Sequence, residues 1–394
     1  MKNNPLDDII KCQIEISSPA SSDAAFDRIL IVVASPLETS EKEMKKTTAI
    51  SKAEDLLEYG FTVEDAAYAA ATTAFSQNPS PDELYVCIRK VIESEKEEEG
   101  ETNLVEDTTL SDTEDLVNGE EAAGRSYEDI RITLTRAASE VGFYGIHLTE
   151  FERNTEDLQH AIAWAESNEK LFCFEYQDYE NFPLKNTSYY RSFCLYSGQA
   201  EGYDTEQPTE NQYAALAWMA KCFGYNPGTE TWHLKELASI VPSVLRADQK
   251  KKLEEQHINT FLRYAGSHCT IGGYTLAGEW VDVIRFRDWL KAEMQNRIFQ
   301  ILKANRKVPF TDQGIGLIEG AMESVLKDGQ DIGGIAATEY DREGKERLGF
   351  QVFVPKASDL TEAERKSRKL TGCRYTARLA GAIHAVEIEG YLTF

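Results

Sequence analysis

Residues 28–34 of the chain, Arg-Ile-Leu-Ile-Val-Val-Ala, form a continuous apolar run without alternation. Such a run is typical of a parallel strand that is buried on both faces. Working outward, apolar runs predict further strands at residues 83–88, 143–148, 170–176 and 191–196, and helical spacing predicts helices at 63–75, 126–141, 155–166 and 211–222. We expect Ser126 to cap the second of these helices. Strands that alternate with helices predict an α/β layer domain with a largely parallel sheet.

The second half of the chain predicts a separate α+β domain. Gly272 and Gly273 lie between short apolar segments and predict the turn of a hairpin. A long helix is expected over residues 279–304, and Thr311 is placed to cap a second one that runs to residue 327. A strand at 350–354, a charged helix at 361–370 and a β segment at 373–379 follow.

Both ends of the chain predict strand-forming arms. Near the N-terminus, apolar residues alternate with polar ones at Ile10, Cys12, Ile14 and Ile16. The last segment begins at Ile383, and its apolar face carries Val386, Ile388, Leu392 and Phe394. This period is that of a half-buried strand, and each segment therefore needs a sheet to join. The expected organisation is an N-terminal strand arm and linker (1–24), an α/β domain (25–248), an α+β domain (249–380) and a C-terminal strand arm (381–394).

The composition indicates a folded but acidic protein. Of 394 residues, 42% are hydrophobic, and 67 acidic residues against 42 basic ones give a formal net charge of −25. This charge argues against binding to nucleic acid or to an anionic membrane surface, both of which attract clustered Lys and Arg. Part of the charge is local, because Lys96 is the only base between residues 92 and 121. We expect residues 93–124 to form a solvated, disordered acidic insertion.

Cysteine usage and hydropathy indicate a protein made in a cytoplasm. The seven cysteines are scattered, and no pair has the C-x-x-C spacing. We expect reduced and mostly buried thiols. The first ten residues do not resemble a signal peptide, and no apolar run approaches the roughly 20 residues that span a bilayer.

The sequence contains no recognisable set of catalytic residues. The phosphate-binding, dinucleotide-binding and nucleophile-elbow motifs are missing from the sequence. His268 and Cys269 are adjacent, so their side chains would diverge on a strand and make a poor nucleophile–base pair. His147 is expected to be a core or edge histidine, and for His384 a pH-sensing role is the less favoured of two readings. We therefore predict no catalytic residues, no cofactor and no metal site.

Charged residues on the long helix have two interpretations. Asp282 and Asp288 flank Arg285 and Arg287 at helical spacing. Such pairs are usually solvated contacts worth a few tenths of a kcal/mol. The less favoured alternative is that some of them bridge subunits of an assembly.

Two long segments of the second half carry a resemblance to a known family. They are residues 278–290, Gly-Glu-Trp-Val-Asp-Val-Ile-Arg-Phe-Arg-Asp-Trp-Leu, which continue to residue 315, and residues 370–390, which begin Leu-Thr-Gly-Cys-Arg-Tyr. A weaker third segment covers residues 74–84. In these segments the chain resembles the tail sheath proteins of contractile phages.

The resemblance implies a structural role. A sheath subunit polymerises helically with copies of itself around a tail tube protein, and the tail also contains baseplate and tail terminator proteins. The terminal arms add strands to sheets of neighbouring subunits, the C-terminal domain lies nearest the tube, and contraction drives the tube through the target envelope. The expected location is the virion tail, assembled in the host cytoplasm, with neither nucleic-acid binding nor membrane insertion.

Two other functions stay open at this point. The chain could be another particle protein, such as a tail tube or baseplate component, or the sheath of a bacteriocin-like or injection-system particle. The fold and arms fit this last option equally well. An α/β enzyme with a ligand at the switch point of the sheet is the other alternative. The missing catalytic constellation argues against the enzyme.

Overall fold

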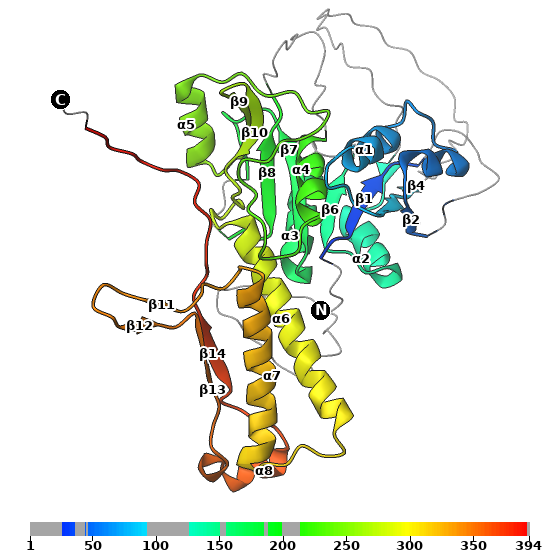
Figure 1. Ribbon diagram of the computed structural model, residues 1–394. Helices are drawn as coiled ribbons and strands as arrows, with labels where there is room; N and C mark the ends of the chain where they lie inside the picture. The colour runs from blue at the N-terminus through cyan, green and yellow to red at the C-terminus, as the bar shows by residue number, and fades with distance from the viewer. Residues whose placement is uncertain are drawn as a thin grey trace, which may run out of the picture.

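The computed structural model describes residues 26–35, 44, 46–92, 126–149, 155–184, 188–198 and 213–391. An α/β domain forms one end of an elongated molecule, and a pair of long helices extends away from it (Figure 1). The predicted N-terminal arm and acidic insertion lie outside the described residues.

The α/β domain is built on a six-stranded sheet with the order β2-β3-β1-β6-β7-β8. Its strands are β1 (Ile29–Val33), β2 (Thr48–Ile50), β3 (Leu84–Ile88), β6 (Gly145–Leu148), β7 (Leu171–Tyr176) and β8 (Ser192–Tyr196). Strand β2 pairs antiparallel with β3, whereas β3, β1, β6, β7 and β8 are mutually parallel. The predicted α/β fold with a parallel sheet is therefore confirmed.

Helices cover both faces of this sheet. Ile29, Ile31 and Val33 share one core with α1 (Ala66–Phe75) and α4 (Ala214–Phe223). Leu30 and Val32 point into the other core, with α2 (Ile130–Glu140) and α3 (Thr155–Asn168). The continuous apolar run of β1 thus reflects burial on both sides. A 3-10 helix, η1 (Ala53–Tyr59), precedes α1.

One predicted helix start is wrong. Ser126 lies in a short strand, β5 (Ser126–Tyr127), which pairs with β4 (Val91–Ile92). Helix α2 is instead capped by Asp129, whose side chain accepts from the N–H of Arg131 at 2.8 Å. Both residues are good caps, and the pairing of β5 decides between them.

The predicted hairpin turn is also misplaced. The hairpin consists of β9 (Thr260–Tyr264) and β10 (Ser267–Ile271), and it turns at residues 265–266, before the two glycines. Gly272 has φ +107° and packs against Asn259, where a Cβ atom would lie 2.3 Å from Oδ1. Asn259 also exchanges backbone hydrogen bonds with Cys194 and Tyr196 of β8. The glycines therefore pack around Asn259, which attaches the hairpin to the edge of the sheet. The helix α5 (Ala247–Glu255) precedes this residue in the chain.

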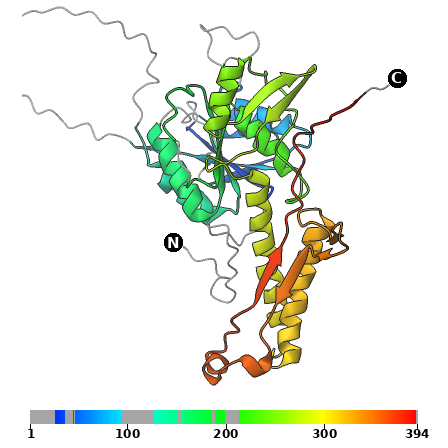
Figure 2. The ribbon, with the colours of Figure 1, turned by 90° about the vertical axis from the view of Figure 1, so that its left-hand side faces the viewer.

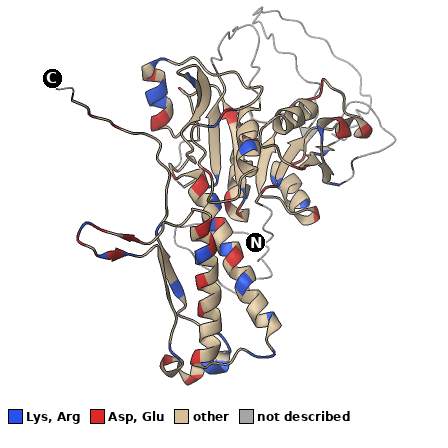
Figure 3. Ribbon diagram, viewed as in Figure 1, with Lys and Arg blue, Asp and Glu red and all other residues tan. Residues whose placement is uncertain are grey.

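The long helical pair forms the second part of the molecule. It consists of α6 (Val281–Ala304) and α7 (Asp312–Asp331), and Thr311 caps α7 as predicted, its hydroxyl accepting from Gly314 N–H at 3.2 Å. After α7 come β11 (Glu339–Tyr340), β12 (Glu346–Arg347), β13 (Phe350–Phe353), η2 (Ala357–Asp359), α8 (Glu362–Ser367) and β14 (Arg374–Ala377). The two-stranded β13–β14 sheet lies along α7, and acidic and basic residues are interspersed along both long helices (Figures 1 and 3).

Candidate functional site

Helix α6 belongs to both parts of the molecule. Its 24 residues rise through about 36 Å. Val281 and Ile284 pack into the core of the α/β domain, whereas Phe286, Leu290 and Met294 pack against α7. One continuous helix therefore joins the two cores.

The first half of α6 carries buried charges that meet the edge of the sheet. Asp288 accepts from Arg191 of the loop before β8 at 2.7 Å and from the hydroxyl of Tyr144 at 2.7 Å. Arg287 also donates to Asp288, at 2.9 Å. Burial pushes the pKa of Asp288 up, but the positive charges of Arg191 and Arg287 and these hydrogen bonds hold it below its usual value.

Arg285 makes a second attachment one turn earlier. Its guanidinium donates to Glu230 at 2.6 Å and to carbonyl oxygens that include those of Cys222, Tyr225 and Phe26. The side chains of Arg285 and Glu230 are each 1% exposed. The favoured interpretation of these helix charges as solvated pairs is wrong, because Arg285, Arg287 and Asp288 are buried, and Arg285 and Asp288 bind partners distant in sequence.

The sequence contains a weak signal for this burial. The charges at 285, 287 and 288 lie between Ile284, Phe286 and Leu290, so this part of α6 has no uniformly polar face. A helix whose charges alternate with core positions has neighbours on most sides. The identity of the partners could not be inferred, because they are set by the tertiary fold.

The β13–β14 sheet presents open edges. Phe350, Val352 and Tyr375 pack toward the core of α6 and α7. Among the described residues, β13 and β14 pair only with each other. Edges of this kind expose unpaired backbone groups and can accept a further strand.

The chain leaves this sheet as an exposed C-terminal arm, which we define in the structure as residues 381–391. Just before it, Ala380 N–H donates to Gly334 and Arg378 N–H to Gly349. Beyond Gly381 the chain is extended, and the side chains of Ile383, Val386 and Ile388 are 85%, 72% and 87% exposed. The strand predicted here is not formed in the single chain, while Leu392 and Phe394, like Ile10, Cys12, Ile14 and Ile16, lie outside the described residues.

His384 is the exception within the arm, because it packs against the α/β domain. Its ring stacks on that of His233, with centroids 4.4 Å apart, and meets the ring of Trp280 edge-on at 4.5 Å. Figure 2 shows the arm passing the α/β domain before it extends away.

The described residues offer little for catalysis. They contain no group of three or more His, Cys, Asp and Glu side chains that could hold a metal ion. His147 is fully buried as predicted, with Nε2 3.0 Å from Glu175, and the ring of His268 and the thiol of Cys269 sit on successive residues of β10. The six described cysteines form no disulfide, and five of them are buried. No helix in the described ranges is long and apolar enough to cross a membrane.

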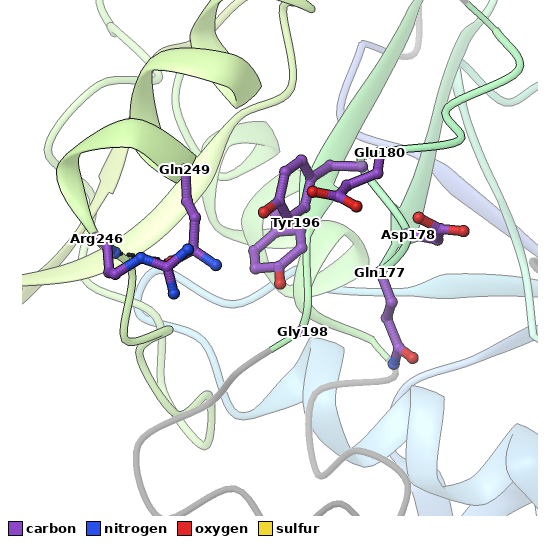
Figure 4. A pocket seen from close by; sticks show the side chains of 8 residues that line it. Gln177, Asp178, Glu180, Tyr196, Gly198, Arg246 and Gln249 are labelled. Carbon is purple, nitrogen blue, oxygen red and sulfur yellow. Dashed lines mark hydrogen bonds between the residues drawn. The ribbon is translucent and has the colours of Figure 1, made fainter.

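A pocket of about 480 Å³ opens at the carboxyl ends of β7 and β8 (Figure 4). It is lined by Gln177, Asp178, Tyr179, Glu180, Tyr196, Gly198, Arg246 and Gln249. These described lining residues include no serine, cysteine or histidine, so they supply no nucleophile–base pair. Hydrogen bonds from Asn181 lower the pKa of Asp178, which keeps it ionised.

The second part of the molecule resembles a known protein family, and the whole fold resembles several solved structures. Residues 281–391 match the C-terminal domain of the family described as E217 tail sheath protein gp31-like. No curated protein sequence matches the chain at a significant level.

Several solved structures share the fold over nearly the whole chain. A chain of the anti-feeding prophage (AFP) baseplate is 13% identical with a TM-score of 0.61, and the match covers 98% of both chains. The AFP helical sheath in the contracted state is 11% identical, with 97% of both chains covered and a TM-score of 0.61. The contracted PVC sheath of an extracellular contractile injection system is 8% identical, with coverage of 97% of this chain and 96% of that one and a TM-score of 0.60.

The family match covers α6, α7, the β13–β14 sheet and the arm, which are the elements of the candidate site. The AFP and PVC sheath structures add that 97% of this chain shares their fold. The C-terminal part of the chain therefore matches a tail sheath family, and the chain as a whole shares the fold of solved sheath proteins of contractile particles.

Proposed function

We propose that this sheath subunit polymerises helically around an inner tail tube by exchanging strands with its neighbours, and that the polymer contracts to drive the tube through a target envelope. The observation that carries the proposal is that one chain contains both an exposed apolar arm and a two-stranded sheet with open edges. The two features are complementary: within the described residues the arm is extended and exposed, and β13 and β14 pair only with each other.

The arm needs a partner to become ordered. Fixing its backbone costs about 1–2 kcal/mol per residue. Each new hydrogen bond returns only about 0.5–1.5 kcal/mol. Burial of Val386 and Ile388 adds about 1.5–3 kcal/mol each, so the arm becomes ordered only where a neighbour supplies both an edge and a pocket. Their exposure in the single chain supports this.

The β13–β14 sheet is the proposed acceptor. Its inner face is already packed on α7, so its edges are the parts that can accept another strand. Addition of a strand to such an edge is a general mode of peptide recognition. The N-terminal arm, with Ile10, Cys12, Ile14 and Ile16, is proposed to join the same kind of sheet. From the resemblance to tail sheath proteins, we further propose that the α+β domain lies nearest the tube.

Contraction is proposed to be a change between two packings of the same subunit, with the contracted packing lower in free energy. No nucleotide is needed for such a switch. We accordingly infer that the subunit has no catalytic activity and binds no cofactor, and that its partners are other copies of itself, the tail tube protein, the baseplate and the tail terminator.

The particle type has two candidates. A virion tail assembled in a host cytoplasm is the first, and it is supported by the family match to a tail sheath. An extracellular injection particle is the second, and it is favoured by the likeness to the AFP and PVC sheaths. Electron microscopy of particles purified from the producing strain separates them, because only a virion carries a capsid.

The central test is electron microscopy of the purified recombinant protein. Hollow helical tubes without a tube protein inside are expected, because the contracted packing is the more stable one. Native mass spectrometry of the same sample is expected to find no stoichiometric nucleotide or metal. A protein that stays monomeric at high concentration and with its natural tube protein present would contradict the proposal.

A further inference from the structure

His384 attaches the arm to the α/β domain at a single point. Besides its ring contacts with His233 and Trp280, its Nε2 atom lies 2.9 Å from the hydroxyl oxygen of Thr231. The flanking apolar residues Ile383 and Val386 are exposed. Because the contact is confined to one residue of an otherwise exposed segment, it indicates a specific attachment of the arm to the α/β domain.

The surface that receives His384 is held in place by its own subunit. We call Thr231, His233 and Trp280 the dock. Thr231 Oγ1 accepts from the backbone N–H of His233 at 3.3 Å, and the Nδ1 atom of His233 lies 3.1 Å from the nitrogen of Gly272. The ring of Trp280 packs on Tyr274, with centroids 4.4 Å apart. The dock is thus organised by two loops that do not depend on the arm.

Attachment at residue 384 has a geometric consequence for the arm. Side chains alternate between the two faces of an extended chain, so His384, Val386 and Ile388 share one face. Holding the ring of His384 therefore fixes both the direction in which the arm leaves the subunit and the face on which its apolar residues lie.

We propose that Thr231, His233 and Trp280 form a docking site for His384 that aims the C-terminal arm at the neighbouring subunit, and that mild acid opens this site. The inference rests on the proposed function, because it assumes that the arm joins another subunit. His384 is a positioning residue in this scheme.

The charges around the two rings explain the effect of acid. Burial lowers the pKa of His384, and the nearby His233 and Lys235 lower it further. Burial also lowers the pKa of His233; Lys235 adds to this, and the hydrogen bond to Gly272 opposes it. Protonation of both stacked rings would place two positive charges side by side, next to a third on Lys235.

Among the described residues, the neighbouring carboxylates have other partners or lie in the exposed arm. Glu230 is engaged by Arg285 at 2.6 Å, and Glu279 accepts from the N–H of Trp280 at 3.0 Å. Asp282 accepts from the N–H of Val283, and Glu387, further along the arm, is exposed. Within the described part of the chain, neither ring of the stack forms an ion pair with a carboxylate, so acid destabilises the stack.

Docking can be measured in the full-length subunit, kept dilute, with a bimane fluorophore on Ala385→Cys, because indole quenches bimane on contact. We expect Trp280 to quench the label at about pH 7.5 and the quenching to be relieved at about pH 5.5. His384→Phe, which keeps an aromatic ring but cannot titrate, should stay quenched at both pH values. The label in Trp280→Phe should be bright at both pH values. Labelling of the native cysteines is measured by treating the parent protein, without Ala385→Cys, in the same way.

Two results would overturn the dock. One is a bright label at neutral pH that Trp280→Phe does not change. The other is an acid response in His384→Phe equal to that of the parent. His268→Gln, which removes a histidine on β10 away from the dock, should respond like the parent.

Assembly of tubes, followed by light scattering and electron microscopy, separates this inference from the proposed function. We expect acid to slow parent assembly markedly, because the protonated His384 leaves the dock, and to leave His384→Phe nearly unaffected. Tubes that form with the same acid dependence in both proteins would overturn the dock and leave the sheath function intact. If no protein forms tubes while the bimane response is as expected, the dock stands and strand exchange fails.

Discussion

The carboxylate of Asp288 lies 2.7 Å from the Nη1 atom of Arg191, although 97 positions separate the two residues in the sequence. Both side chains are essentially unexposed. The bond connects helix α6 to the strand that ends the sheet, so it holds the long helix against the α/β domain.

Removing the carboxylate should destabilise this junction strongly. Asp288→Ala leaves Arg191 buried without its main partner, which typically costs about 3–5 kcal/mol. We expect a large fall in the midpoint of thermal or urea unfolding. The matched control is Glu362→Ala, which breaks an exposed pair with Lys366 and should cost at most about 1 kcal/mol. Equal effects of the two changes would show that the buried pair does not secure the junction.

Asp282, in the first turn of α6, should make stability depend on pH in the opposite sense to an ordinary ion pair. Burial, with the charges of Glu230 and Glu279, raises the pKa of this carboxyl from 3.8 to about 6. A raised pKa means that ionisation is harder in the folded state, so the cost is present above about pH 6 and disappears as the pH falls toward 3.8. Asp282→Asn should therefore stabilise the protein by about 1–3 kcal/mol at neutral pH and by nothing at acid pH.

The measurement for Asp282 is a series of urea unfolding curves across this pH range. Glu323→Gln on the exposed face of α7 serves as the control for loss of one negative charge. A gain that is the same at every pH, or that the control reproduces, would contradict the raised pKa as its cause.

Truncation after Gly381 should separate folding from assembly. Among the removed residues that the structure describes, 382–391, most are exposed, so the shortened chain should remain soluble with nearly the same unfolding midpoint. It should form no tubes, because the strand that joins the neighbouring sheet is gone. Sedimentation and electron microscopy provide the readout, and tubes of normal length from the truncated chain would refute the role of the arm.

A single charge in the arm should have the same effect as truncation. Ile388→Asp would bury an unpaired carboxylate in the joint between subunits, at a cost of several kcal/mol. The conservative Ile388→Val keeps the apolar face and should assemble at close to the normal rate. The contrary observation would be normal tubes from Ile388→Asp, or equal loss of assembly in the two variants.

Hydrogen exchange can locate the joint without any substitution. Backbone amides of the arm, and those of β13 and β14 that point away from the partner strand, should exchange fast in the monomer and become protected in tubes, because strand addition supplies their missing acceptors. Amides of β1, which is central in its sheet, should be protected in both states. Protection that appears elsewhere and leaves the arm unchanged would move the joint to another surface.

The elements that sequence periodicity predicted are those with strong local patterns. The run of β1 and the spacing along α6 and α7 each define one element without reference to the rest of the chain. The hairpin turn was misplaced because the conformation of Gly272 serves a distant residue, Asn259, rather than the turn. The cap of α2 was misplaced because Ser126 pairs with β4, which is contributed by a segment before the acidic insertion.

The candidate site was predictable to a similar extent. Alternation predicted an arm over residues 383–394 with one apolar face, because both are properties of a short segment. The described residues of this arm are extended and mostly exposed, and they form no strand in the single chain. The partners of Arg285 and Asp288 could not be predicted, since Glu230, Arg191 and Tyr144 come from three other parts of the chain. The contact of His384 with His233 and Trp280 was missed for the same reason.

Helix α6 runs unbroken from one hydrophobic core into the other, with Arg285 and Asp288 fastened at one end and Arg297 bonded to Asp328 of α7 at 2.8 Å further along. A rod clamped in this way has no hinge at the boundary between the domains. A force applied to the α/β domain is therefore transmitted as torque through α6 to the second part of the molecule. If the subunit polymerises and contracts as proposed, we expect the change between the two packings to be taken up at the joints between subunits, where the arm can move, while each subunit turns as one rigid body.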